Sequence, residues 1–383
     1  MRKLTLLLCL PLLFSCGGNS SEKTESGNIL ENLSFTVDTV LIDAGEDFFV
    51  LNSGLGAKVI SEDGNTLYFF ERDPLNLVEV DLNSLRLVRK TPFQKEGPDG
   101  IGSYLLGFQV SGKEELFIHG FNTLGKYNFK GEKTENLNIM PEGIDKLLAE
   151  NLYQIYGKAI FDFEKYRIFS QPSGEEFKEK ELFIIDPSTK TLRRKSVPEM
   201  KAVNEFSGTL TTISRETKMV RYFGVGNYIS LENGQIFLSA GSMSGLYRFD
   251  IGTDSLTFIP IQHQKFPNRM QVKVNNLPTD EAEFREDRRK VFAELNYMEP
   301  LWDETRKMYL RLGKKTFLGE KQGDPSKFEV FLFAYDEDFK VLGETKIEGL
   351  KQVPENYFWK NGKLWSYVNV EDELGFAVME FTF

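Results

Sequence analysis

The chain of 383 residues carries 57 acidic and 47 basic side chains, which gives a formal net charge of −10 at pH 7. This balance argues against nucleic acid and anionic membrane surfaces as partners, because both repel a negatively charged protein. The two cysteines are Cys9 and Cys16, so a folded body beyond them must rely on its hydrophobic core rather than on disulfides.

The first sixteen residues have the pattern of a bacterial lipoprotein signal. Arg2 and Lys3 precede an apolar stretch, Leu4 to Leu13, that is too short to span a bilayer. The stretch ends in a small-residue cleavage site followed by Cys16. We therefore predict a signal peptide over residues 1–15 and lipidation at Cys16. A secretory signal that is cut elsewhere is the alternative.

Residues 16–30 are predicted to form a lipidated tether. Between Gly17 and Asn28 the chain is rich in glycine, serine, glutamate and lysine and has nothing to bury. Each buried methylene of an acyl chain contributes about 0.8 kcal/mol, so several chains would hold the protein on a membrane. Gly17 resembles the outer-membrane sorting pattern of Gram-negative lipoproteins, so we expect an exported protein anchored to the outer membrane. The sequence leaves open whether it faces the periplasm or the medium.

Residues 31–383 are predicted to form one all-β domain. Apolar residues alternate with period two far more often than with the helical period, and pairs such as Asp63-Gly64 and Asn233-Gly234 mark tight turns between strands. The strands recur in groups of four, which predicts a β-propeller of six four-stranded blades. The second strands of the groups begin near residues 67, 116, 166, 235, 308 and 364. Because this spacing is uneven, a meander, two packed sheets or two smaller domains are the alternatives.

The last group has one strand too few. Its three strands are Tyr357 to Lys360, Leu364 to Val368 and Phe376 to Phe383. Leu33 to Leu41 reads as a strand with no partner nearby, and it would complete the last blade and remove exposed sheet edges. We therefore predict that Phe35 and Val37 lie beside Val378 and Phe381.

Two insertions explain part of the uneven spacing. Residues 141–154 contain a proline and leucines at helical spacing, which predicts a short helix. Within residues 261–303, Asp280 and Glu283 have the pattern of a capping box that begins a helix. This longer insertion could cap a pocket at one end of the propeller, or it could be a solvated helix that covers a blade.

One stretch carries a family resemblance. Leu77 to Lys90 (LVEVDLNSLRLVRK), followed by Lys95 to Ile101 (KEGPDGI), resembles the lipoprotein family known as domain of unknown function 4221. The resemblance extends over the lipidation signal, the tether and the body. It implies a propeller-like body and brings no established activity and no catalytic residue.

Recognisable chemical motifs are missing from the sequence. His119 and His263 are the only histidines and lie far from each other and from any cysteine, which argues against a histidine-rich metal site. Gly54-Leu55-Gly56 lacks the third glycine and the helix of a dinucleotide site. We predict no metal site and no cofactor. Calcium at the acidic turns Asp336 to Asp338 or Glu371 to Glu373 is a weak alternative, because neither has the spacing of a calcium loop.

Arginines and aromatic residues near strand ends are the remaining candidates for a ligand site, since forked donors and flat rings suit carboxylates and sugars. They are Arg72, Tyr104, Arg167, Tyr222, Arg269 and Trp302. The alternative for each is structural: arginines that cap blade edges and aromatic rings that fill the space between blades.

Two classes of function are consistent with these observations. The first is a noncatalytic, monomeric propeller of the cell envelope that binds a glycan, a peptide or a protein. The second is an enzyme of the lyase or lactonase type that acts on a polar substrate such as a saccharide. Ionisable side chains with perturbed pKa values that converge in the channel would favour the enzyme, whereas an apolar channel would count against it. The sequence identifies no catalytic residue.

Overall fold

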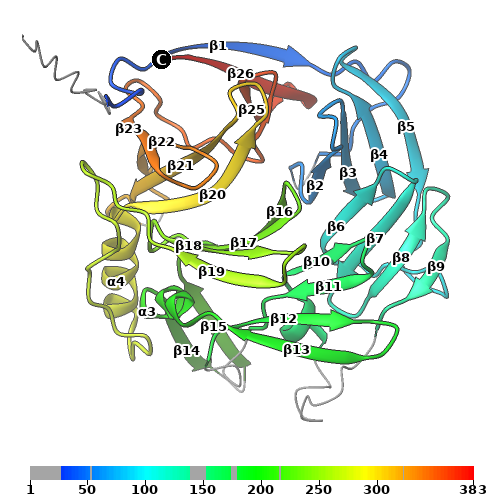
Figure 1. Ribbon diagram of the computed structural model, residues 1–383, viewed down its shortest axis with the longest axis horizontal. Coiled ribbons are helices and arrows are strands. Elements are labelled where there is room, and N and C mark those ends of the chain that lie inside the picture. The colour runs from blue at the N-terminus through cyan, green and yellow to red at the C-terminus, as the bar shows by residue number, and fades with distance from the viewer. Residues whose placement is uncertain (1–26, 52–53, 139–151, 174–178, 215–216, 322) are drawn as a thin grey trace, which may run out of the picture.

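The structure is a computed structural model that describes residues 27–51, 54–138, 152–173, 179–214, 217–321 and 323–383. In these residues six four-stranded antiparallel sheets surround a central axis (Figure 1). The predicted six-bladed β-propeller is therefore confirmed. The predicted signal peptide, Cys16 and the tether up to residue 26 lie outside the described residues. Within the described part, no helix is both long and apolar enough to cross a membrane.

Each blade runs from an innermost strand beside the axis to an outermost strand at the rim (Figure 1). The first three blades consist of β2 (Lys58–Ile60), β3 (Thr66–Arg72), β4 (Leu75–Asp81), β5 (Arg86–Pro92); β6 (Leu105–Ser111), β7 (Glu115–Gly120), β8 (Leu124–Asn128), β9 (Lys133–Asn136); and β10 (Ala159–Asp162), β11 (Arg167–Ser170), β12 (Glu181–Asp186), β13 (Thr191–Ser196). The last three consist of β16 (Asn227–Glu232), β17 (Gln235–Ala240), β18 (Leu246–Asp250), β19 (Ser255–Ile259); β20 (Asn296–Asp303), β21 (Met308–Phe317), β22 (Lys327–Tyr335), β23 (Val341–Lys346); and β24 (Phe358–Lys360), β25 (Lys363–Val370), β26 (Glu373–Thr382), β1 (Ser34–Leu41).

The hydrophobic core lies between neighbouring blades. Middle strands such as β7 and β17 are buried along nearly their whole length, because a blade packs against a neighbour on each face. Outermost strands such as β13 alternate between exposed and half-buried residues. Between the first two blades, the ring of Phe70 meets Phe93 and Phe108 edge to face at centroid distances of 5.1 and 5.0 Å.

The N-terminal strand closes the ring. β1 pairs antiparallel with β26 over all eight of its residues, with Phe35 opposite Phe381 and Val37 opposite Met379. The rings of Phe35 and Phe381 lie 5.8 Å apart. Val378 stands opposite the residue after Val37, so the predicted closure of the last blade is confirmed.

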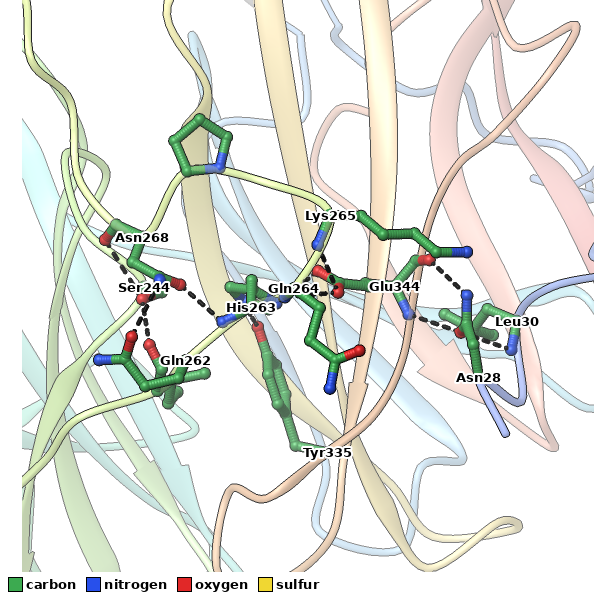
Figure 2. A network of polar contacts seen from close by, with 12 residues as sticks. Asn28, Leu30, Ser244, Gln262, His263, Gln264, Lys265, Asn268, Tyr335 and Glu344 are labelled. Atoms are coloured by element: carbon green, nitrogen blue, oxygen red, sulfur yellow. Dashed lines mark hydrogen bonds and ion pairs between the residues drawn. The ribbon is translucent and has the colours of Figure 1, made fainter. Parts of the chain in front are cut away.

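A short segment before β1 is attached to the fifth blade. The side-chain amide of Asn28 donates to the backbone carbonyl of Glu344 at 2.9 Å and accepts from its N–H at 2.9 Å (Figure 2). The N–H of Ile29 donates to the carbonyl of Leu342 at 3.1 Å. The chain therefore contacts the outermost strand of one blade before it completes the next.

The insertions differ in part from expectation. α2 (Leu152–Tyr156) is a helix of five residues, and most of the predicted helix over 141–154 lies outside the described residues. α4 (Glu281–Ala293) begins as predicted, because the Asp280 side chain accepts from the N–H of Glu283 at 2.9 Å. α4 packs against the edge of the ring rather than over the channel (Figure 1). It therefore covers a blade, as the second of the two expectations had it.

One element was not predicted. After η1 (Pro198–Lys201) and α3 (Ala202–Glu205), the strands β14 (Gly208–Ser214) and β15 (Thr217–Phe223) form a two-stranded hairpin between the third and fourth blades. α4 packs on this hairpin, with the rings of Phe223 and Phe284 5.2 Å apart. The hairpin inserted between blades three and four thus packs against the helix inserted between blades four and five.

Candidate functional site

The six ligand-site candidates from the sequence do not form one site. They lie in or beside β3, β6, β11, β15, the segment before α4, and β20. Because strands alternate in direction, the end of β3 and the start of β6 reach one mouth of the channel, whereas the start of β11 and the end of β20 reach the other. Arg72 and Tyr104 are thus separated from Arg167 and Trp302.

Three of these side chains have protein partners. Arg269 Nη2 lies 2.5 Å from a carboxylate oxygen of Glu205, and Trp302 Nε1 donates to Glu304 at 2.7 Å. Arg167 Nη1 lies 3.8 Å from Asp254. These contacts fit the structural alternative. Tyr104 and Tyr222 remain largely exposed, at 66% and 62%.

A different set of ionisable residues gathers along the axis, which the sequence did not single out. The channel cluster comprises Lys58 from β2, Tyr228 and Glu232 from β16, Glu299 from β20, and Tyr357 directly before β24. These are the innermost strands of four blades. Lys58, Tyr228, Glu232 and Glu299 are half-buried, so protein surrounds them and water still reaches them.

The two carboxyl groups of the channel cluster resist ionisation. Burial, with a smaller contribution from the charge of Glu299, raises the pKa of Glu232 to about 8. Burial also raises the pKa of Glu299, while the ammonium of Lys58 partly offsets this effect. Glu232 is therefore largely protonated at pH 7 and can donate a hydrogen bond.

Burial also shifts the pKa values of the one lysine and the two phenols of the cluster. Burial lowers the pKa of Lys58, and the Glu299 charge opposes that change. Burial raises the pKa of Tyr228 to about 12 and that of Tyr357 well above its ordinary value. The Tyr357 hydroxyl is buried and has no hydrogen-bond partner among the described residues. Buried polar groups without a partner are rare in folded proteins, so this hydroxyl is a candidate for contact with a ligand.

A β-bulge in β20 and a glycine before β16 help to position the side chains of the channel cluster. The pairing of β20 with β21 shifts register between Tyr297 and Pro300, so Glu299 lies in a β-bulge, a feature that redirects side chains. Directly before β16, a Cβ at Gly226 would overlap the hydroxyl of Tyr228, so glycine at this position leaves room for the phenol.

Arg311 stabilises the β-bulge through a hydrogen bond to its backbone. Its side chain is fully buried, and Nε donates to the carbonyl of Met298, next to Glu299, at 2.5 Å. Its Nη1 donates to the carbonyl of Ser244 in the fourth blade at 2.5 Å, and its guanidinium lies 4.8 Å from the ring centre of Tyr297. Arg311 thus joins two blades at the position of the bulge.

His263 belongs to a buried polar network near this position (Figure 2). Its Nδ1 lies 3.0 Å from a carboxylate oxygen of Glu344, and its Nε2 lies 3.2 Å from the Tyr335 hydroxyl. The other Glu344 oxygen accepts from the N–H groups of Gln264 and Lys265 at 2.7 and 2.9 Å. Burial, with a smaller contribution from the Arg311 charge, lowers the pKa of His263 to about 4. The neutral ring therefore holds the 261–270 segment on the blade.

His119 is equally unsuited to acid–base chemistry at neutral pH. Burial lowers its pKa to about 4, and its ring packs 5.7 Å from that of Phe117. In the described part of the chain, no three His, Cys, Asp or Glu side chains are grouped so as to hold a metal ion. In the acidic turn after β22, Asp336 accepts from the N–H groups of Asp338 and Lys340.

A pH-dependent stability effect follows from Glu232. Its pKa is higher in the folded protein than the ordinary value of 4.5. Glu232 therefore does not lower the free energy of unfolding below about pH 4.5, and lowers it progressively as the pH rises to about 8. We expect Glu232→Gln to stabilise the protein by roughly 2–4 kcal/mol at pH 8.5, where a buried charge is removed, and by little at pH 5. Urea unfolding at both pH values measures this. The control Glu348→Gln, at a side chain 82% exposed, should show no pH-dependent difference, and an equal effect of Glu232→Gln at both pH values would contradict the assignment.

Comparison with known proteins agrees with the fold. The family described as a domain of unknown function, DUF4221, matches residues 26–346. A solved structure of a member of that family from Bacteroides vulgatus superposes with a TM-score of 0.65 at 15% identity, covering 91% of this chain and 98% of that one. A Bacteroides fragilis protein provisionally named as exported has a TM-score of 0.48 at 10% identity, covering 91% and 95%. A search of curated proteins found no match. The chain thus belongs to the DUF4221 family.

Proposed function

We propose that the protein is an exported, lipid-anchored propeller of the cell envelope that binds a small saccharide in its central channel. The observation that carries this proposal is the unpartnered, buried hydroxyl of Tyr357 within the channel cluster. A polyhydroxylated ligand needs donors and acceptors of several kinds together with flat ring faces. This combination is provided by protonated Glu232, Glu299, Lys58 and the Tyr228 phenol, which water reaches, together with the buried Tyr357 phenol.

Thermal shift and calorimetry on the purified mature chain test this proposal. The probes are a panel of neutral, amino and uronic-acid mono- and disaccharides, of which at least one should raise the melting temperature. We expect Lys58→Met and Glu299→Gln each to weaken its binding about 10- to 100-fold, the effect of losing one charge-assisted hydrogen bond.

Matched exposed variants separate binding from general effects. Lys113→Met and Glu348→Gln remove the same charges from exposed positions and should leave affinity unchanged. The proposal is wrong if no probe stabilises the protein, or if the channel variants bind as well as the controls do.

A second candidate function is catalysis at the same place. Two carboxyl groups that lie close enough to interact, one of them protonated at neutral pH, are the arrangement used for general acid and base catalysis. An enzyme of the lactonase or lyase type would consume one of the sugars or sugar lactones when it is followed by NMR, and Glu232→Gln would stop the reaction. Binding without turnover would favour the noncatalytic function.

A further inference from the structure

One face of the hairpin β14–β15 carries three exposed apolar side chains. The register places Ile213, Val220 and Tyr222 on this face, with exposed fractions of 76%, 53% and 62%. The other residues of the face are Thr209, Thr211 and Lys218. Within the described residues, β15 pairs with no strand other than β14, so one of its edges is open. α4 packs on the opposite face of the hairpin through Phe223. The open edge is a template for another strand.

A groove of about 520 Å³ lies directly beside this strand. Its lining comes from β15, α4 and the segment after β21, and it contains five basic and three acidic side chains. This local excess of base stands out in a chain with more acidic than basic residues. Arg285 and Arg288 are exposed, and the Arg288 guanidinium lies 5.1 Å from the ring of Phe292.

Two of the three acidic side chains of the groove, Glu281 and Asp324, accept hydrogen bonds. Glu281 accepts from Arg221 at 3.0 Å and from Arg285 at 2.5 Å, which fixes the two guanidinium groups at the wall. Asp324 accepts from the backbone N–H of Lys321 at 2.9 Å. Arg288 and Lys321 remain as cations for a partner.

We propose that the hairpin and groove bind an extended, acidic segment of a protein partner, which adds a strand to the open edge of β15. Backbone hydrogen bonds would pair the segment with β15, and alternate side chains would contact Val220 and Tyr222 on one side and the basic groove on the other. An acidic glycan is less suited to this surface, because aliphatic residues such as Ile213 and Val220 offer a sugar no hydrogen bond. This site is separate from the channel, so it does not depend on the function proposed above.

Fluorescence anisotropy with defined peptides tests the proposal. The probe is a labelled peptide of five Asp-Val repeats, and the comparison probes are five Lys-Val repeats and trigalacturonate. We expect the full mature chain to bind the Asp-Val peptide, and binding to weaken as salt is raised. The double variant Arg288→Gln/Lys321→Gln should weaken it about tenfold, and Ile213→Thr/Val220→Thr about fivefold.

Controls at unrelated positions complete the experiment. Arg86→Gln, at a side chain 70% exposed on the first blade, and Lys58→Met in the channel should leave peptide affinity unchanged. The substituted hairpin and groove residues are exposed, so melting temperatures should stay near that of the wild type. The proposal is overturned if the Asp-Val peptide does not bind, if the Lys-Val peptide or trigalacturonate binds as tightly, or if the hairpin variants disperse a dimer of the chain.

Discussion

Replacing Phe35 with aspartate is expected to destabilise the propeller by about 2–4 kcal/mol, and removing residues 27–41 is expected to abolish cooperative folding. Phe35 packs on Phe381 across the β1–β26 pair, and its neighbour cluster includes Leu30. A charge in place of this half-buried ring loses the packing on Phe381 and part of its own hydration. Without β1, the whole length of β26 becomes an open sheet edge. Among the described strands, β1 and β26 are the only paired strands that are not consecutive in the chain, so this strand pair alone joins the two ends of the ring by hydrogen bonds.

Val37→Asp is the matched control for this experiment. It introduces the same side chain into the same strand, at a residue that is 51% exposed. We expect this variant to lie within about 0.5–1 kcal/mol of the wild type in urea unfolding. Equal stability of the Phe35 and Val37 variants, or a cooperative melt of the truncated chain near the wild-type temperature, would show that β1 does not hold the ring together.

Replacing Arg311 with methionine is expected to cost about 3–5 kcal/mol of unfolding free energy. The substitution leaves the buried carbonyls of Met298 and Ser244 without their donor, at about 1–3 kcal/mol for each orphaned group. Arg311→Lys should recover little, because an ammonium lacks the planar fork that reaches several carbonyls.

Saccharide affinity in the channel provides a second measurement on the Arg311 variants, because it depends on the position of Glu299. If Arg311 holds the bulge, a folded Arg311→Lys protein should lose saccharide affinity in the channel as well as stability. Arg86→Met, which removes an exposed arginine, should change neither. A loss of stability with unchanged channel binding would show that Arg311 acts in the core alone and does not position Glu299.

The repeated strand pattern was sufficient to predict most of the architecture. Each blade packs on both faces, so its middle strands must be apolar and bounded by turns, and segments such as Gln235–Ala240 show this without any tertiary information. The capping box at Asp280 and the unpaired strand Ser34–Leu41 were also visible, because both depend on short-range patterns or on counting strands.

The hairpin β14–β15 escaped prediction for a local reason. Its strands alternate weakly, and the residues between them, Arg215 and Glu216, contain no glycine, proline or asparagine to mark a turn. For α4 the sequence left two positions open, a cap over the channel or a cover on a blade, because a capping box specifies where a helix begins and not what it packs on.

The channel cluster could be found only in the tertiary structure. Lys58 and Glu299 lie 241 residues apart in the chain and meet because the ring brings the innermost strands of distant blades to one axis. Period-two alternation assigns a residue to a face of a strand and does not say which strand is innermost, and the bulge at Glu299 breaks that alternation. The sequence alone therefore determined the number and order of the blades, because these depend on local alternation and turns. The tertiary structure decided where ionisable groups meet and how burial shifts their pKa values, because both depend on contacts between residues remote in sequence.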